Sequence, residues 1–419
     1  MQKFIKYFSV AALMCGVSLT TSALAGGYQL QEYSSVAAGR AFAGAGIVGD
    51  DYSAIAFNPA GMTLKGSGVQ AGGMLIDIHS NLENGKLYNA NGTEITAGDK
   101  AKLRNPKVIP HFFGQYKLSE NWRIGLGVYV PFGLGTYYNK SWFGRTHSLT
   151  SEITTIDINP TLAWKPLSWL SVGGGVIFER MEARLTNSTN PVVNDGRMSD
   201  MNADGWGHGW NAGIMISPTK TTRFGLAYRS PVVQNIKGKH HLQHPQLGVR
   251  EGYSSTKLVD PEHIQLTAYQ EVGKFGLSAM ARWTRWSRFN LLSIKSTALP
   301  AALSPSQVDE NWRNTWTLSA GVDYHYCKNL TFRTGLAYDQ GAVKNPEHRT
   351  ARVPDSNRWI ASVGASYMKG NWQFDVNYFH MFWSKARVNS RANTTGTTTI
   401  RGTYRTQINS LGFGVQYHF

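Results

Sequence analysis

The amino-acid sequence predicts an all-β membrane protein, a 14-stranded antiparallel transmembrane β-barrel with a small helical N-terminal hatch (plug) inside the lumen. Three observations support this fold. Charged residues make up only 16% of the 419 residues, whereas glycine occurs 44 times and aromatic residues reach 12%, a mixture typical of twisted strands and turns. Apolar and polar residues alternate in many segments. Short turn sequences and long polar stretches follow one another along the chain.

Residues 1–25 have the pattern of a signal peptide. Two lysines precede an apolar stretch from Phe8 to Leu19, and Ala23-Leu24-Ala25 supplies a small-x-small cleavage pattern. We expect the mature chain to begin at Gly26 and to keep a single cysteine, Cys327, which cannot form an intramolecular disulfide. An exported, glycine-rich and aromatic-rich chain without disulfides indicates a bacterial envelope protein.

Residues 26–65 do not have the pattern of strands. An alanine- and glycine-rich piece from Val36 to Gly44 is followed by residues 50–62, which contain Pro59. Short helices, broken by glycine and stopped before Pro59, are expected here. The segment is longer than a periplasmic tail needs to be. We predict that it folds inside the barrel, because a fourteen-stranded lumen would otherwise leak.

Residues 66–419 show the alternation of a barrel wall. Apolar and polar residues alternate in 122–130, 223–229, 312–326 and 330–339, and the apolar set of 312–326 includes Trp312. A helix would scatter the charges around its axis, whereas a strand places them on one face. A soluble sandwich also alternates, but these apolar sets carry aromatic residues near their ends, as an interfacial girdle does. After the signal peptide no run of about 18 apolar residues exists, which excludes a helical span.

Turn sequences give the number of strands. Six short turns alternate with seven long polar stretches, so thirteen connections join fourteen strands, with short periplasmic turns and long external loops. The short turns lie near 119–121, 165–167, 218–220, 272–274, 327–329 and 369–371, and the long stretches near 81–104, 134–146, 187–202, 239–255, 297–311, 341–355 and 391–403.

The C-terminal strand indicates the location. Leu411, Phe413, Val415, Tyr417 and Phe419 alternate with glycine and polar residues, and the chain ends on an aromatic residue. An ordinary edge strand avoids such an apolar face. This strand is expected to pair with the first strand and face lipid. Its terminal phenylalanine resembles the signal recognised by the outer-membrane assembly machinery, so we predict the bacterial cell outer membrane.

An ordered series of short sequences runs along the mature chain. The pieces are Gly27-Tyr28-Gln29-Leu30-Gln31-Glu32-Tyr33-Ser34, Gly39-Arg40-Ala41-Phe42-Ala43-Gly44, Asp50-Asp51 with Asn58-Pro59-Ala60, Trp206-Gly207-His208-Gly209-Trp210-Asn211-Ala212-Gly213, Tyr228-Arg229-Ser230, Trp283-Thr284-Arg285-Trp286-Ser287, Thr331-Phe332-Arg333-Thr334-Gly335 and Pro354-Asp355 with Arg358-Trp359. Each piece is weak alone, but together they resemble the FadL/TodX (OmpP1) family of outer-membrane transporters for long-chain fatty acids and hydrophobic compounds. The resemblance implies the plugged fourteen-stranded barrel and no enzyme activity.

The resemblance implies a route for the ligand. Capture among external loops is followed by transfer to a lumenal pocket, movement of the hatch and lateral release through a kinked third strand. Here that strand ends in Pro131, Phe132, Gly133, Leu134 and Gly135. Pro131 removes a ladder donor, and the two glycines permit departure from regular pairing. From the residues alone, a loop beginning at Pro131 is an equally good interpretation.

The resemblance also assigns roles to the hatch. Asn58, Pro59 and Ala60 match the family's Asn-Pro-Ala element beside the kink, where Asn58 would cap backbone groups freed at the opening. A plain helix stop is the alternative. Tyr28 matches the aromatic residue near the mature N-terminus that contacts the pocket in the family, and simple packing is the alternative.

Basic residues are candidates for binding a ligand carboxylate. Arg180 and Arg184 fall on the fifth predicted strand, and Arg333 and Asp339 on the lumen face of the eleventh. A guanidinium matches a carboxylate fork, although lumenal arginine is also common as structural lining. The family's lysine after the ninth strand has no counterpart in 299–305, which leaves a neutral hydrocarbon open as the ligand.

Other functions and partners follow less well from the sequence. A general diffusion porin and an aromatic-hydrocarbon channel of the same fold remain alternatives, and no pairing of serine and histidine favours a lipid hydrolase. We expect no cofactor and no metal, because the glycine pattern of 44–49 follows no strand and the group His240, His241 and His244 lacks further ligands. The excess of basic residues suits lipopolysaccharide phosphates rather than nucleic acid. A monomer is expected.

Overall fold

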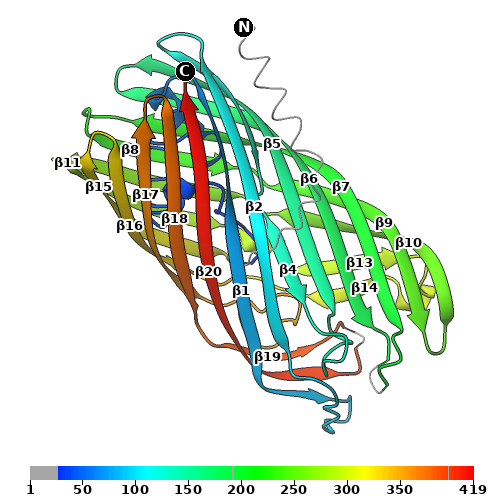
Figure 1. Ribbon diagram of the computed structural model, residues 1–419. Coiled ribbons are helices and arrows are strands. Elements are labelled where there is room, and N and C mark those ends of the chain that lie inside the picture. The colour runs from blue at the N-terminus through cyan, green and yellow to red at the C-terminus, as the bar shows by residue number, and fades with distance from the viewer. Residues whose placement is uncertain (1–26, 191–192, 395) are drawn as a thin grey trace.

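The computed structural model describes residues 27–190, 193–394 and 396–419, so the predicted signal peptide lies outside the described residues. All strands belong to one antiparallel sheet, which closes because β1 pairs with β20 over almost its whole length. The wall is tall and strongly tilted (Figure 1). Its strands are β1(Gly68–Tyr88), β2(Lys102–Lys117), β3(Trp122–Tyr129), β4(Gly133–Tyr137), β5(Thr150–Leu167), β6(Leu170–Ser188), β7(Met198–Ile216), β8(Thr222–Arg229), β9(Val232–His244), β10(Gly248–Asp260), β11(His263–Val272), β12(Phe275–Thr284), β13(Leu291–Ser296), β14(Ser306–Asp309), β15(Thr315–Cys327), β16(Leu330–Asp339), β17(Arg358–Lys369), β18(Trp372–Trp383), β19(Ala386–Arg391) and β20(Thr399–His418).

The twenty strand segments form fourteen wall strands, because six wall strands are each built from two consecutive segments. These pairs of segments are β3 with β4, β8 with β9, β10 with β11, β12 with β13, β14 with β15 and β18 with β19. The predicted closed barrel of fourteen antiparallel strands is therefore confirmed. In the described part of the chain, no helix is both long enough and apolar enough to cross a bilayer.

The alternation of the sequence places side chains on the two faces of the wall as predicted. Phe224, Leu336 and Trp316 are 50%, 51% and 49% exposed on the outer face, whereas Arg123 is buried in the lumen. The expectation for Trp312 was wrong. β15 begins only at Thr315, and Trp312 is fully buried in an aromatic cluster inside the barrel.

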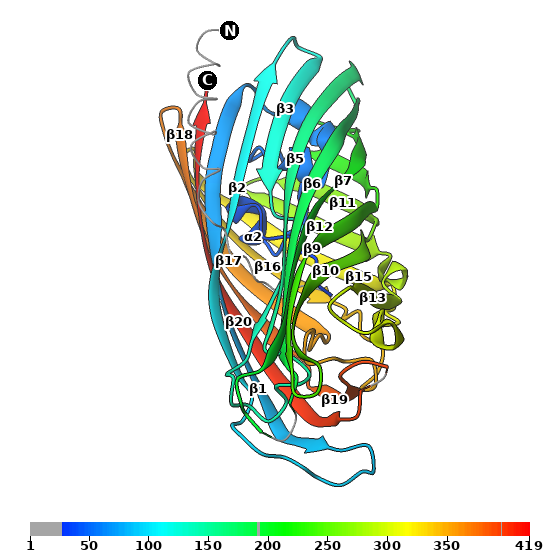
Figure 2. The same ribbon diagram turned by 90° about the vertical axis from the view of Figure 1, so that its right-hand side faces the viewer.

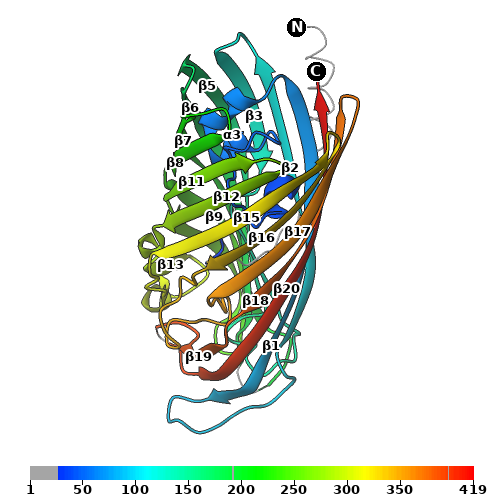
Figure 3. The same ribbon diagram turned by 90° about the vertical axis from the view of Figure 1, so that its left-hand side faces the viewer.

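Residues 27–65 lie inside the lumen (Figures 2 and 3), and nearly all of them are buried. They contain two short helices, α2(Ser35–Ala38) and α3(Ala54–Phe57), and a 3-10 helix, η2(Pro59–Leu64). The hydroxyl of Ser34 accepts a hydrogen bond from the backbone of Ala37 and caps α2. These residues are called the hatch below. The hatch fills the barrel between its short-turn end and the pocket described next.

A buried network of ion pairs joins the hatch to the wall. Arg40 of the hatch contacts Asp50 at 2.6 Å and Asp323 of β15 at 3.2 Å. Arg333 of β16 contacts the same two carboxylates, each at 3.1 Å. Removing one member would leave a buried charge without its partner, which is strongly destabilising. The network therefore holds the hatch at this side of the lumen.

Glycines of the wall allow the hatch to approach closely on the opposite side. A Cβ atom on Gly213 of β7 would lie 2.0 Å from Oδ1 of Asn58, and one on Gly173 of β6 would lie 2.5 Å from the carbonyl carbon of Pro59. Only glycine fits at such distances. The Asn58-Pro59 element therefore packs directly against the backbone of β6 and β7.

Candidate ligand pocket and break in the wall

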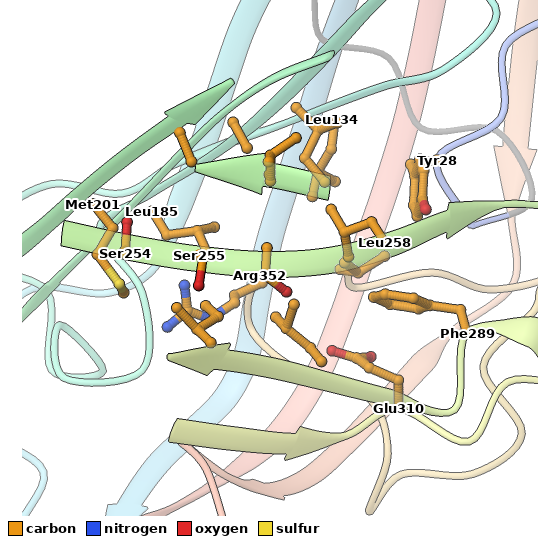
Figure 4. A pocket seen from close by; sticks show the side chains of 18 residues that line it. Tyr28, Leu134, Leu185, Met201, Ser254, Ser255, Leu258, Phe289, Glu310 and Arg352 are labelled. Carbon is orange, nitrogen blue, oxygen red and sulfur yellow. The ribbon is translucent and has the colours of Figure 1, made fainter. Parts of the chain in front are cut away.

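A largely apolar pocket lies in the lumen on the side of the long loops (Figure 4). Its empty space is about 680 Å³, a value that includes open solvent at its mouth. Alternation explains its lining, because every second residue of the surrounding strands faces inward. The aliphatic and aromatic residues around it are Leu134, Ile153, Ala183, Leu185, Met201, Ala203, Ile236, Leu258, Phe289, Leu292, Ile294 and Val353.

Two charged side chains enter this apolar pocket from loops. Arg352 comes from the loop between β16 and β17, and Glu310 from the segment between β14 and β15. The Nη1 atom of Arg352 is shielded from solvent and has no hydrogen-bond partner among the described residues. Oε2 of Glu310 accepts a hydrogen bond of 2.9 Å from Nε1 of Trp312. The pocket thus holds a guanidinium with a free donor.

Burial shifts the proton affinity of both groups. It raises the pKa of the Glu310 carboxyl to about 7, and it lowers the pKa of the Arg352 guanidinium, although the nearby Glu310 acts in the opposite direction. Arginine nevertheless remains charged at any physiological pH. Near neutral pH a share of Glu310 is uncharged, so the pocket then carries a net positive charge.

The start of the hatch forms one end of the pocket. The ring of Tyr28 contacts Phe132, Trp286, Phe289 and Trp312 at centroid distances of 4.9 to 5.9 Å. Most of these contacts have the edge-to-face geometry that aromatic rings favour. Tyr28 therefore lines the pocket and is packed tightly between the third wall strand and the loops.

The third wall strand is interrupted next to Tyr28. β3 pairs with β5 up to Tyr129↔Asp157, and β4 resumes the pairing at Gly133↔Thr154. Between these two pairs the third wall strand contains one residue more than β5, as in a β-bulge. On its other side the third wall strand pairs with β2 through β3 only, the last pair being Phe112↔Val128. No backbone pairing joins β2 to β4 in the described residues.

On the side where β2 would pair, the backbone of the interrupted segment is hydrogen-bonded to the hatch. The N–H of Gly133 donates to the carbonyl of Tyr28 at 2.8 Å, and the N–H of Leu30 donates to the carbonyl of Pro131 at 2.7 Å. Phe132 donates to Oγ1 of Thr155 at 3.0 Å. Strand geometry resumes at Gly133, so residues 131–135 form a kink with continuing β-structure rather than the beginning of a loop.

A buried charge cluster supports the kink from inside. Arg229 of β8 donates to Asp157 of β5 and, at 2.7 Å, to Glu179 of β6. Its guanidinium carbon lies 5.6 Å from the centroid of the Phe132 ring. A cation over an aromatic face is attractive. The cluster therefore holds Phe132 against the lumen.

Asn58 occupies a different place from the one expected. Its Nδ2 donates to the carbonyls of Ile214 on β7 at 3.2 Å and Leu226 on β8 at 3.5 Å, and its Oδ1 accepts from the backbone of Ala60 at 3.1 Å. Asn58 therefore contacts carbonyls of the paired sixth and seventh wall strands, and not backbone groups freed at the kink. Residues 28–30 provide the contacts at the kink.

Arg180 and Arg184 do not enter the pocket. On β6 the inward positions are Ala183 and Leu185, so the arginines point to the outer face. Arg180 contacts Glu182 and Asp204 there at 3.2 and 3.1 Å. Arg184 contacts Asp200 at 2.7 Å. The expectation of ligand contact from these two residues was wrong, because the alternation of β6 places them on the other side of the wall.

Arg333 and Asp339 face the lumen as expected but belong to structural networks. Arg333 is bound to the carboxylates that hold the hatch. Asp339 binds Arg358 and accepts a hydrogen bond of 2.6 Å from Thr317. Neither lines the pocket. The described residues contain no group of three or more histidine, cysteine or carboxylate side chains suited to a metal ion.

Comparison with known proteins agrees with this architecture. The sequence profile described as "Outer membrane protein transport protein (OMPP1/FadL/TodX)" matches residues 16–419. The 47 kDa outer membrane protein of Pasteurella multocida (strain Pm70) is 28% identical over 95% of this chain and 95% of its own. The long-chain fatty acid transport protein of Escherichia coli O6:H1 (strain CFT073) is 28% identical over 87% of this chain and 91% of its own.

Solved structures show the same fold. A Pseudomonas aeruginosa FadL homologue has a TM-score of 0.84 at 24% identity, over 94% of this chain and 99% of that chain. The Ralstonia pickettii toluene transporter TbuX has a TM-score of 0.68 at 18% identity, over 93% and 99%. Because the profile spans nearly the whole sequence, this chain belongs to the OMPP1/FadL/TodX family of outer membrane transport proteins, which are transporters rather than enzymes.

Proposed function

We propose that the protein carries long-chain fatty acids or related hydrophobic molecules across the outer membrane. The ligand passes from the external loops into the lumenal pocket and leaves sideways through the kinked third strand after the hatch moves. One observation supports this proposal above the others. An apolar pocket that contains an unpaired guanidinium donor lies directly beside the stretch of wall where β2 and β4 lack backbone pairing.

The pocket suits an amphipathic acid. An alkyl chain gains roughly 0.8 kcal/mol for each methylene that moves from water into an apolar site. The aliphatic lining from β6, β7, β9 and β10 provides that site. The carboxylate would accept hydrogen bonds from Arg352, whose Nη1 has no partner of its own. Tyr28 would contact the ligand where the pocket meets the kink.

The wall geometry supports lateral release. A fully paired barrel offers no passage for a hydrocarbon, because opening it would break several backbone hydrogen bonds in lipid. Between β2 and β4 those bonds are already missing in the described residues. On the hatch side, two backbone hydrogen bonds join the kink segment to residues 28 and 30, while on the other side it stays bonded to β5. Movement of the hatch N-terminus would therefore free the kink on the side of the hatch and β2 while its bonds to β5 persist.

An aromatic hydrocarbon is the second candidate ligand. The aromatic cluster around Tyr28 and the apolar lining favour it, and relatives of this fold include proteins named toluene transporters. A general diffusion porin is disfavoured, because the hatch fills the lumen with buried side chains. Contact with lipopolysaccharide, insertion by the outer-membrane assembly machinery through the terminal Phe419, and a monomeric state complete the proposal.

Uptake of radiolabelled oleate and of radiolabelled toluene by a host lacking its own transporter tests this function. We expect restored oleate uptake. Asn58→Ala and the double variant Gly133→Ala/Gly135→Ala should assemble normally but transport poorly, since they alter the hatch and the kink. Gly73→Ala is the matched control, because a Cβ there meets only ordinary contacts. Unchanged uptake by both test variants would count against the gating scheme, and restored toluene uptake alone would identify the aromatic ligand.

A further inference from the structure

The outer face of the wall carries a row of lysines outside its apolar band. Lys237 of β9 pairs in register with Ser255 of β10, and Ser255 pairs with Lys295 of β13. The side chains of Lys237 and Lys295 point outward by the alternation of their strands and are exposed, whereas Ser255 between them is half-buried and lines both the lumenal pocket and the outer face. Strands lie about 4.8 Å apart, so the two lysine Cα atoms are ~10 Å apart with a hydroxyl between them.

The neighbouring rows add further positive charge. Lys239 pairs with Tyr253, and Lys257 pairs with Asn235, again with outward side chains. No ion pair involves any of the four lysines in the part of the chain that the structure describes. The nearest carboxylate in register with Lys237 is Asp204, which already binds Arg180 at 3.1 Å. The surface therefore has unbalanced positive charge.

The surface is also hollowed and lies next to the apolar band of the outer face. Lys237, Tyr253, Ser255, Lys295, Thr297 and Pro305 line a depression in the outer wall. Toward the short turns, Val233, Val259 and Trp206 continue the same face as an apolar band. Toward the long loops, β9 and β10 end in a hairpin far from the C-terminus (Figure 1). In bacterial barrels that end is external.

We propose that this depression binds a phosphate group of lipopolysaccharide, with Lys237 and Lys295 on either side of the phosphate and Ser255 donating from its base. The acyl chains would lie along Val233 and Trp206. The inference rests on the proposed contact with lipopolysaccharide and not on the nature of the transported ligand. The binding also has a structural use. β13 is joined to β10 by only three register pairs, and a phosphate held by Lys237 and Lys295 would bridge this weak seam.

Native mass spectrometry of the folded mature chain tests the site. The protein is incubated with bisphosphorylated lipid A, with dephosphorylated lipid A and with phosphatidylglycerol. We expect selective retention of bisphosphorylated lipid A, reduced at least about fivefold in Lys237→Gln/Lys295→Gln, because each lysine facing an anionic lipid contributes to binding. Lys220→Gln/Lys328→Gln, which removes two exposed lysines at the short-turn end, should retain lipid A like the wild type.

Three results would overturn the proposal. These are equal retention by the Lys237/Lys295 variant, equal binding of dephosphorylated lipid A by the wild type, and equal binding of phosphatidylglycerol, which would assign the site to phospholipids in general. The arm with dephosphorylated lipid A uses the wild-type protein and does not depend on the folding of any variant. Oleate uptake by the double variant should equal that of the wild type, so failure of this site and failure of the transport proposal are distinguishable.

Discussion

Replacing Arg352 by glutamine tests the chemistry of the pocket directly. The Nη1 atom of Arg352 is shielded from solvent and unpaired among the described residues, while the residue as a whole is half-buried. A hydrogen bond to a charged group contributes about 1.5 to 3 kcal/mol. We expect the lower part of that range for a half-buried side chain, about 1.5 to 2 kcal/mol, which corresponds to a 10- to 30-fold rise in Kd for oleate.

The assay compares two ligands with the same chain. Binding of oleate and of oleyl alcohol is measured on the purified, folded protein in detergent at the same neutral pH. Arg352→Gln should weaken oleate binding and leave oleyl alcohol nearly unchanged, because only the acid uses the guanidinium. Arg352→Lys keeps the charge without the fork and should give an intermediate loss. Arg180→Gln, on the outer face, is the matched control and should bind both ligands normally.

Two outcomes would refute the reasoning. If oleate binds Arg352→Gln as tightly as it binds the wild type, the guanidinium does not hold the carboxylate. If both ligands lose affinity equally, Arg352 shapes the pocket and does not recognise the headgroup. A neutral hydrocarbon would then be the better candidate for the natural ligand.

Three further predictions concern the pocket and the hatch. Burial raises the pKa of Glu310 to about 7, so this group loses its proton as the pH rises through neutrality. The Glu310 carboxylate then repels the carboxylate of the ligand and competes with it for Arg352. Oleate affinity of the wild type should therefore fall as the pH rises from 6 to about 8, whereas a titration of Glu310→Gln should show a flat profile. Gly213→Val should displace Asn58 of the hatch, since even a Cβ atom would lie 2.0 Å from its Oδ1. Planar-bilayer recordings should then show new ion conductance, while heat-modifiable gel mobility shows an intact barrel. A closed channel would mean that the wall moves instead of the hatch. Deletion of residues 26–65 should give a permanently conducting, porin-like channel in the same recordings, and a silent channel would show that the loops close the lumen.

Much of the wall followed from local sequence. A barrel strand has lipid on one side and the lumen on the other, so a period of two reports the orientation of each side chain within the apolar band. Phe224 and Leu336 were placed correctly on this ground. Turn residues gave the fourteen strands, because each connection is a local feature. The break at Pro131 also has a local cause, since proline removes a donor and glycine relaxes the backbone.

The position of charges outside the apolar band was not determined by local pattern. Above that band the polarity of β6 is reversed, because the pocket makes its lumen face apolar at Ala183 and Leu185 while the outer face carries Arg180, and so Arg180 was assigned to the wrong face. Trp312 was also misplaced, because the strand begins at Thr315, three residues later than the alternation suggested, and the ring of Trp312 is buried inside the barrel.

The pocket itself was decided only by tertiary structure. Arg352 lies in a loop that has no periodicity, and its role arises because closure of the barrel brings that loop opposite Glu310 and Tyr28, which are distant in sequence. Asn58 likewise meets β7 and β8 because of the path of the hatch through the lumen. The sequence by itself determined a plugged fourteen-stranded wall, since local alternation and turns encode it. Long-range packing determined which side chains meet inside, since such contacts leave no periodic trace in the sequence.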